Sequence, residues 1–227
     1  MLKVCLAIVV VLLAYLIGCV NPAIIITKAI YKDDVRNWGS KNAGATNVFR
    51  NYNIQTGTIV LVLDVLKGVL AIVMAHAAIS HFKLSYSMHI EHLCFLAVVL
   101  GHCFPVFFEF KGGKAVATAM GCLLILHPLL ISIALGVFIL VFIKVKIVGV
   151  SSVCAALSLI PSYFVVALIN SGINFTYRGT YYCICLIPSY FVVALINSGI
   201  NWDFLYILAV VSIIVVTHIK NLKLYLN

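Results

Sequence analysis

The chain of 227 residues is 64% hydrophobic and only 9% charged, with a mean hydropathy of +1.19. Soluble domains average about 45–50% apolar and about 25% charged residues, so this composition excludes a soluble domain, a coiled coil and a disordered chain. Fifteen Lys and Arg against six Asp and Glu give a net charge of +9. These charges stand in short segments between apolar runs, where they set membrane topology or bind anions, and they do not indicate nucleic acid as a partner.

The apolar runs predict an all-α integral membrane protein, a single domain over residues 1–227, with about seven transmembrane helices, some of them short. In chain order the predicted spans are Val4–Thr27, Thr56–Ala78, a run that ends near Phe108, two short helices within Val116–Ile143, Val148–Ile169 and Phe204–Thr217.

The run Val116–Ile143 is ambiguous, because it is long for one helix and each of its halves is short for a full span. The proline of His127-Pro128 favours a break there. Two helices also satisfy the positive-inside rule, because they leave the cationic loops and the tail in the cytoplasm and the N-terminus outside. We therefore expect an outer turn at His127-Pro128.

One internal repeat disturbs this pattern. Leu159–Asn174 and Leu186–Asn201 both read LIPSYFVVALINSGIN, offset by 27 residues from 159 to 186. A single perfect copy favours a tandem duplication or a sequence-assembly error over a repeat architecture, whose copies diverge. If Tyr181–Ile196 forms an extra span, it reverses the orientation of everything after it and places the tail outside.

The richest polar segment is Asp34–Arg50, which combines glycines, hydroxyls, amides and two arginines. The arginine fork suits phosphate, and glycines let backbone N–H groups approach an oxyanion closely. A solvated positive-inside loop would explain the cations of this segment. It would not explain the density of Gly, Ser, Thr and Asn, so the segment predicts phosphate binding.

A second polar cluster is Lys111-Gly112-Gly113-Lys114, directly before an apolar helix. We expect free N–H groups and the positive end of a helix dipole there, beside the Lys114 cation. The third cluster is Asp64 and Lys67, inside a span and three residues apart, so they share a helix face. Charges inside a membrane favour a functional role, and a structural ion pair explains the two residues equally well.

Nucleophilic and metal chemistry find little support in the sequence. The G-x-S-x-G elbow, the zinc-binding spacing H-E-x-x-H and a histidine followed five positions later by aspartate are all missing. We therefore predict no metal and no organic cofactor. Any acyl transfer would rest on positioning and on anion stabilisation.

Three motifs in series carry a resemblance to a known family. They are D-x-R-x-x-G-S-x-N-A-G-A-T-N-V-F-R, D-x-x-K-G and G-H-x-F-P-V-F-x-x-F-K-G-G-K-x-V-A-T, within Tyr15 to about Thr118, and the tail adds to the match. They resemble the bacterial acyl-phosphate:glycerol-3-phosphate acyltransferases, the PlsY family. The resemblance implies a seven-span plasma-membrane protein with its motifs on the cytoplasmic side. Its reaction would move the acyl group of a fatty acyl phosphate to the 1-hydroxyl of glycerol 3-phosphate, giving lysophosphatidic acid and inorganic phosphate in the first step of phospholipid synthesis.

The resemblance also implies roles for single residues. The catalytic candidates are Arg36, Ser40, Lys114, His218 and Asn221, the last two from a tail motif H-x-x-N that would contact glycerol 3-phosphate. The candidates for binding substrate or phosphate are Asn42, Thr46, Asn47, Arg50, Asp64, Lys67, His102, Gly112 and Gly113. The implied partners are glycerol 3-phosphate, fatty acyl phosphate and membrane lipid, and the substrate phosphate would accept the proton in place of a protein base.

The chain departs from the family at three positions of interest. Lys41 and Ala115 stand where the family usually has glycine, and Thr217 replaces an arginine, which removes one anion ligand. A left-handed backbone at Ala115 would cost about 1–2 kcal/mol. With the perfect repeat, these departures keep open an inactive or mis-assembled family member. An organic-phosphate transporter is a weaker alternative, because transporters bind near the midplane between inverted repeats.

Overall fold

The computed structural model describes residues 1–84, 89–170 and 202–226 of the chain, and every regular element in these ranges is helical. The longer helices are α1 (Leu2–Cys19), α2 (Pro22–Tyr31), α4 (Ile54–Phe82), α5 (Ile90–Cys103), α6 (Val116–Leu126), α7 (Pro128–Val145), α8 (Val148–Asn170) and α10 (Trp202–Leu226). Three short elements are η1 (Val35–Asn37), α3 (Ala45–Asn51) and η3 (Val106–Phe108).

Helix length and composition agree with a membrane protein. In the described ranges, 5 helical stretches are long and apolar enough to cross a bilayer. They are Leu2–Tyr31, Ile54–Phe82, Ile90–Phe108, Pro128–Val145 and Val148–Val166. Val116–Leu126 and Asp203–Ile219 are shorter apolar helices. The predicted all-α membrane fold is confirmed, and the count of seven spans stays a prediction.

The first predicted span, Val4–Thr27, lies within the candidate span Leu2–Tyr31, but it is two helices and not one. The chain breaks at Val20, which is extended, and α2 begins with Pro22 at its first position. The Asn21 side chain caps α2 by accepting a hydrogen bond from the Ile24 N–H at 3.1 Å. An Asn cap followed by Pro is a strong helix start, so it ends α1 despite the continuous hydrophobicity.

The predicted break at His127-Pro128 is confirmed. α6 ends at Leu126, and α7 starts at Pro128 and runs to Val145. The proline lacks the N–H that a continuing helix would need, and it fits the first turn of a new one.

Glycines bring two pairs of helices into close contact. A Cβ added to Gly18 of α1 would lie 2.3 Å from the Val98 carbonyl oxygen of α5. A Cβ added to Gly101 of α5 would lie 2.2 Å from the Tyr15 carbonyl oxygen of α1. In the same way, Gly68 of α4 packs against the backbone of α6, and Gly121 of α6 packs against the backbone of α4. Small residues let helix backbones pack closely in a membrane, so these contacts fix α5 on α1 and α6 on α4.

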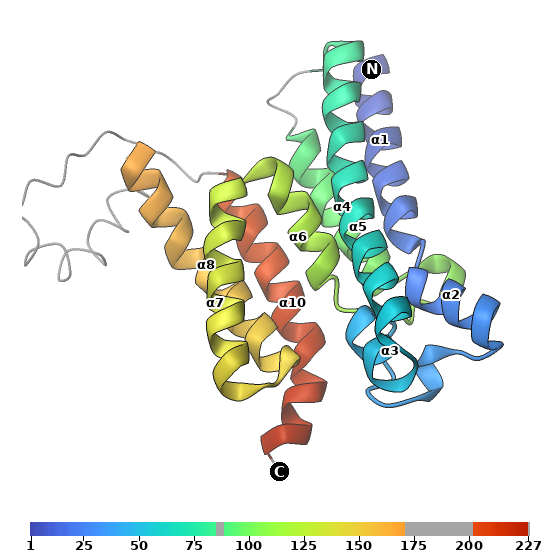
Figure 1. Cartoon of the computed structure of the whole chain (residues 1–227). Coiled ribbons are helices and arrows are strands. Elements are labelled where there is room, and N and C mark those ends of the chain that lie inside the picture. The colour runs from blue at the N-terminus through green and yellow to red at the C-terminus, as the bar shows by residue number, and fades with distance from the viewer. Residues whose placement is uncertain (85–88, 171–201, 227) are drawn as a thin grey trace, which may run out of the picture.

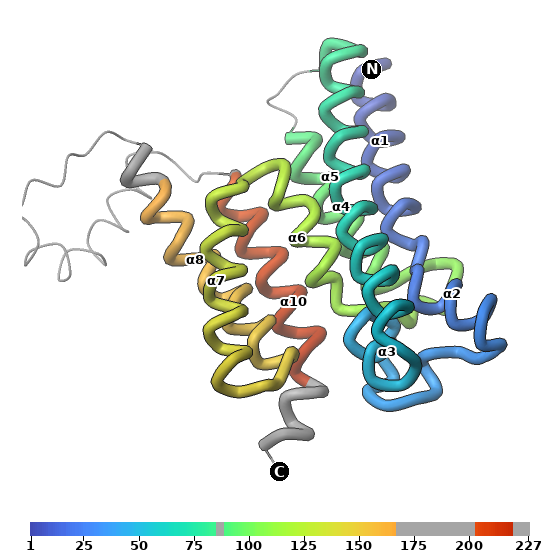
Figure 2. The backbone as a smooth tube through the Cα atoms, in the orientation of Figure 1, coloured from blue at the N-terminus to red at the C-terminus, as the bar shows by residue number. Residues whose placement is uncertain are grey.

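The polar segments gather at one end of the helical bundle (Figure 1). The loops after α2 and α5 and the turn between α7 and α8 lie at this end, and the N-terminus and the α6–α7 turn lie at the other (Figure 2). α10 begins at the end where α8 finishes, and its tail therefore returns to the loop end. The second repeat copy, Leu186–Asn201, and the alternative span Tyr181–Ile196 lie outside the described residues.

Candidate active site

Arg36 ties the first polar segment to the glycine loop. Asp34 caps η1, and its carboxylate accepts from Arg36 Nε at 3.0 Å and from Nη2 at 2.8 Å. Arg36 Nη1 donates to the Phe108 carbonyl at 3.0 Å and to the Lys111 carbonyl at 3.3 Å. The guanidinium holds the pKa of the Asp34 carboxyl well below its usual range. Arg36 therefore joins the two cationic loops.

Asn47 folds the Asp34–Arg50 segment from within. Its buried amide donates to the carbonyls of Val35 at 2.8 Å and Trp38 at 3.0 Å. Its Oδ1 accepts from the Ser40 N–H at 3.1 Å, which fixes the backbone of the predicted catalytic serine. The contacts of Asn47 are thus made inside the loop, and Asn42 and Thr46 lie half-buried nearby in sequence.

The two glycines of the loop are required by close packing. A Cβ on Gly112 would lie 2.0 Å from the His102 carbonyl oxygen, and one on Gly113 would lie 2.0 Å from His102 Nε2. The Gly112 N–H donates to the Cys103 carbonyl at 3.1 Å, and the Gly113 N–H donates to that of His102 at 3.0 Å. The expectation that these N–H groups are free is therefore wrong. The first turn of α6 still presents N–H groups that lack partners within the helix.

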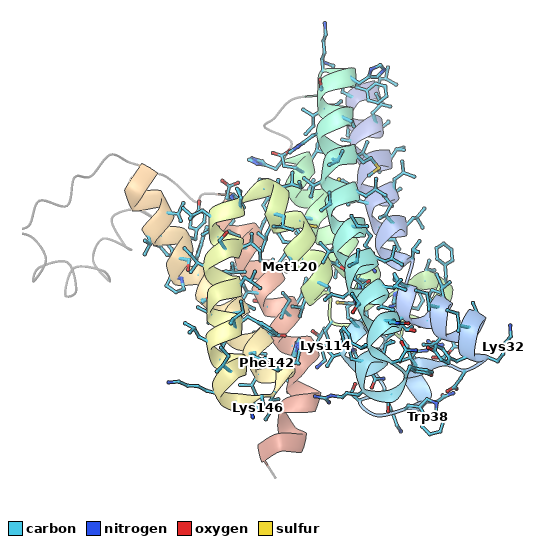
Figure 3. The ribbon with its side chains drawn as sticks, viewed as in Figure 1. Lys32, Trp38, Lys114, Met120, Phe142 and Lys146 are labelled. Carbon is cyan, nitrogen blue, oxygen red and sulfur yellow. The ribbon has the colours of Figure 1, made fainter. Side chains whose placement is uncertain are left out.

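Lys114 is the cation at the centre of the loop end (Figure 3). Burial lowers its pKa to about 8, and the positive charge of Arg50 adds to that effect. Neither Lys114 nor Arg50 pairs with a carboxylate in the part of the chain that the structure describes. Two neighbouring cations without a carboxylate partner among the described residues are an arrangement that attracts an anion.

His218 of α10 joins this cation pair from the other side of the bundle. Its ring is near enough to Lys114 to feel the charge of the ammonium, and it packs 3.9 Å from the Cβ position of Gly149 in α8. His218 Nδ1 lies 2.8 Å from the Ile214 carbonyl, which can only accept, so Nδ1 carries the proton. The backbone at Asn221 continues α10, and its side chain lies outside the described residues.

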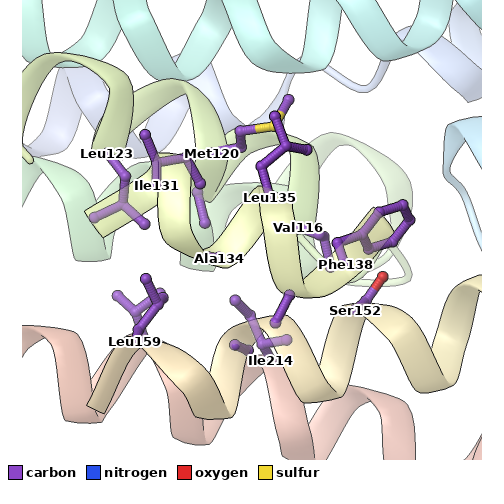
Figure 4. A pocket seen from close by; sticks show the side chains of 14 residues that line it. Val116, Met120, Leu123, Ile131, Ala134, Leu135, Phe138, Ser152, Leu159 and Ile214 are labelled. Carbon is purple, nitrogen blue, oxygen red and sulfur yellow. The ribbon is translucent and has the colours of Figure 1, made fainter. Parts of the chain in front are cut away.

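Beside the cations, α6, α7, α8 and α10 line a partly open apolar cavity of about 80 Å³ (Figure 4). Val116 and Ile214 line it, one residue after Ala115 and one helical turn before His218. Ser152 is the single hydroxyl among its lining side chains. An apolar cavity that begins next to an anion site can accept a molecule with one apolar and one anionic end.

Asp64 and Lys67 form the ion pair that their spacing predicts, with Nζ 2.8 Å from Oδ1, and both are buried. Lys67 Nζ also lies 2.7 Å from His102 Nδ1. These three candidates therefore form a cluster of their own, next to the glycine loop through His102.

Both substituted glycine positions adopt the left-handed backbone. The φ angle is 55° at Lys41 and 58° at Ala115. The strain that was expected at Ala115 is therefore present. Thr217 turns its hydroxyl back to the Ile214 carbonyl at 2.9 Å, so it does not replace the missing arginine as an anion ligand.

Sequence reasoning missed Asn21 and Ser152. The Asn21 amide donates to the Ala43 carbonyl at 3.2 Å and so connects the α1–α2 break to the first polar segment. Its signal was an Asn-Pro pair inside an apolar run. Ser152 follows Ser151 in an otherwise apolar helix just after two lysines, which was the signal for a hydroxyl facing the site end.

Comparisons with known proteins agree with this geometry. The family model for glycerol-3-phosphate acyltransferase matches residues 8–227. The chain is 43% identical to glycerol-3-phosphate acyltransferase 2 of Bacillus anthracis over 149 residues, which cover 65% of this chain and 74% of that one. It is 44% identical to glycerol-3-phosphate acyltransferase of Listeria monocytogenes serotype 4b over 154 residues, which cover 67% and 76%.

Two solved structures share the fold. One is the crystal structure of PlsY, an integral membrane glycerol 3-phosphate acyltransferase, in its glycerol 3-phosphate form, with a TM-score of 0.72 at 28% identity. The match covers 97% of this chain and 92% of that one. The lysophosphatidic acid form of PlsY has a TM-score of 0.68 at 28% identity and covers 97% and 91%.

Proposed function

Because this chain belongs to the glycerol-3-phosphate acyltransferase family, we propose that the acyl group which it transfers to glycerol 3-phosphate comes from a fatty acyl phosphate. The observation that carries the proposal is the pair of cations Lys114 and Arg50 beside the apolar cavity, which pair with no carboxylate in the described part of the chain. An acyl phosphate has one dianionic end and one hydrocarbon end, which suits this combination. The cations would hold its phosphate while the part of the chain nearest the carbonyl enters the cavity at Val116.

The proposed reaction needs no base from the protein. The 1-hydroxyl of glycerol 3-phosphate attacks the acyl carbon, a new ester C–O bond forms, and the bond from the acyl carbon to the phosphate oxygen breaks. The departing phosphate takes the hydroxyl proton, so the products are 1-acyl-glycerol 3-phosphate and inorganic phosphate. The protein contributes by orienting the two substrates and neutralising their charge.

Residue roles follow from position. Lys114, Arg50 and the first turn of α6 would bind the transferring phosphate, and Ser40 and Thr46 are further candidates from the same polar segment as Arg50. His218, with Asn221 one turn further along α10, would hold glycerol 3-phosphate. Arg36, Asn47, Gly112 and Gly113 would act by fixing the two loops against each other.

We also propose that this end of the bundle faces the cytoplasm from the plasma membrane. The residues Lys28, Lys32, Lys41, Lys111, Lys144 and Lys146 belong to the loop-end segments. Excess Lys and Arg in short loops marks the cytoplasmic side. Glycerol 3-phosphate is charged and would reach the site from that side.

The test is turnover by the purified protein in lipid, with palmitoyl phosphate and glycerol 3-phosphate. We expect lysophosphatidic acid and inorganic phosphate in equal amounts, and no product when palmitoyl-CoA replaces the acyl phosphate. Product from palmitoyl-CoA alone would overturn the proposed donor. If neither donor gives product, the chain is the inactive or mis-assembled member, and restored turnover after deletion of Phe175–Asn201 would assign the fault to the duplication.

A further inference from the structure

Three buried polar side chains meet where α1, α4 and α5 cross. Asp64 and Lys67 of α4 are 2% and 7% exposed, and His102 of α5 is 3% exposed. Buried charges of this kind are costly inside a membrane and persist when they are paired or when they serve a site.

The ammonium group of Lys67 has four acceptors around it. It lies 2.9 Å from the Val20 carbonyl and 3.3 Å from the Gly18 carbonyl. The break between α1 and α2 leaves these two carbonyls without a hydrogen-bond donor within a helix. It lies 2.8 Å from Asp64 Oδ1 and 2.7 Å from His102 Nδ1. An ammonium donates hydrogen bonds and cannot accept one. The shortest of the four contacts therefore requires an unprotonated Nδ1 on His102.

Asp64 does not reverse this assignment. Its Oδ1 lies 3.3 Å from His102 Nδ1 and accepts no hydrogen bond from the described residues, but the Lys67 contact with Nδ1 is shorter, and Lys67 neutralises the charge of Asp64. With Nδ1 as the acceptor, the one N–H of the neutral ring is on Nε2.

The Nε2 edge of the ring lies against the glycine loop. A Cβ on Gly113 would lie 2.0 Å from Nε2, and the Gly113 N–H donates to the carbonyl of His102 itself at 3.0 Å. None of the described residues accepts a hydrogen bond from Nε2. The N–H donor of this buried residue therefore faces the loop that leads to Lys114, and it has no hydrogen-bond acceptor among the described residues.

We propose that His102 is a neutral Nε2–H donor to the phosphate bound above the Gly112–Lys114 loop, and that Lys67, paired with Asp64, is a positioning residue that fixes this tautomer. The proposal rests on the proposed function, because it needs a phosphate at that loop. Asp64 and Lys67 then act on the substrate only through His102.

The first experiment reads the tautomer without turnover. The protein carries ¹⁵N-labelled histidine in lipid nanodiscs at neutral pH, and the His102 signals are those missing from the His102→Gln variant. We expect a protonated Nε2 and an unprotonated Nδ1. The double variant Asp64→Leu/Lys67→Met removes both charges together and so avoids a buried unpaired ion; in it we expect Nδ1–H to become populated. A protonated Nδ1 in the parent protein, or an unchanged pattern in the double variant, would overturn the role of Lys67.

The second experiment separates donation from mere packing. Glutamine can place its amide nitrogen near the Nε2 position, whereas asparagine reaches only the Nδ1 position. We expect His102→Gln to lower kcat/KM for glycerol 3-phosphate and acyl phosphate less than His102→Asn does, because only glutamine restores a donor near the Nε2 position. We expect His102→Asn to lower it by about 10- to 100-fold, as loss of a hydrogen bond to a charged group implies.

The matched control is His92→Asn, which removes a buried imidazole at the opposite end of α5. We expect no comparable loss of kcat/KM in that variant. Equal losses in His102→Gln and His102→Asn would overturn donation by Nε2. If the parent protein does not turn over, the NMR result still decides the tautomer, so failure of this inference and failure of the proposed function remain distinguishable.

Discussion

Lys114 is the residue whose charge state matters most for the proposed chemistry. Its pKa is about 8, because burial disfavours the ammonium and Arg50 repels it. The cation proposed to bind phosphate is therefore present below about pH 8 and is lost as the pH rises through that value. Since kcat/KM reports the free enzyme, we expect it to fall on the alkaline side with an apparent pKa near 8.

Two variants test this assignment of the alkaline limb. Lys114→Arg keeps a cation whose pKa exceeds about 12, so the limb should move to higher pH. Lys114→Ala should lower kcat/KM by about 10- to 100-fold at pH 7. An alkaline limb that stays in place in Lys114→Arg would show that another group titrates.

Ala115 and Lys41 are strained residues at positions that suit glycine. Both have a left-handed backbone, which costs about 1–2 kcal/mol for a residue with a Cβ. Replacement by glycine removes this strain and adds a smaller entropic cost of roughly 0.4–1 kcal/mol, because glycine makes the unfolded chain more flexible. We expect Ala115→Gly and Lys41→Gly each to stabilise the protein and to retain activity, measured by thermal unfolding in detergent. Ala119→Gly in the interior of α6 is the control and should destabilise by about 1 kcal/mol. Lower stability in both glycine variants would argue against strain at these residues.

At the scale of elements, the close contact between α4 and α6 holds the glycine loop in place. A Cβ on Gly68 would lie 2.2 Å from the Thr118 carbonyl oxygen, a backbone atom that cannot move without displacing α6. We expect Gly68→Ala to destabilise by about 1–3 kcal/mol and to reduce activity with it. Gly136→Ala in α7 is the matched control, since nothing lies within 4 Å of its Cβ position. That variant should stabilise by about 1 kcal/mol, because alanine favours helix more than glycine does. Thermal unfolding of the pair compares the two effects, and equal shifts would contradict the packing argument.

Helix breaks and contacts between helices differ in how well the local sequence predicts them. The break at His127-Pro128 was predictable because proline acts locally through its missing N–H. The break at Asn21-Pro22 depends on the same local chemistry, but it stands inside an apolar run long enough to span, and the prediction followed the length of that run. The contacts of Lys67 with the Gly18 and Val20 carbonyls could not be foreseen, because they join residues that are distant along the chain.

The candidate site shows the same division. Motif residues marked the two loops, and the structure brings Arg50, Lys114 and His218 to one end of the bundle. The sequence could not distinguish ligands from supports. Asn47 and Arg36 resemble phosphate ligands by residue type, yet their hydrogen bonds hold the loops together. The pattern of Gly112 and Gly113 suggested anion-binding N–H groups, whereas packing against His102 requires those glycines.

At the scale of the whole molecule, orientation is the property that the proposed function depends on. α10 begins at the end of the bundle where α8 finishes, so its tail should share the cytoplasmic side with the Lys144 and Lys146 turn. We expect green fluorescent protein fused to the C-terminus to fluoresce in a bacterial host, and alkaline phosphatase at the same place to stay inactive, since each reporter matures on one side only.

The control is the chain without Phe175–Asn201, whose tail should report the same side because removal of the duplication should not change the number of crossings. An active phosphatase in the full chain and an inactive one after the deletion would mean that Tyr181–Ile196 crosses the bilayer. That result would move His218 away from Lys114 and contradict the proposed site.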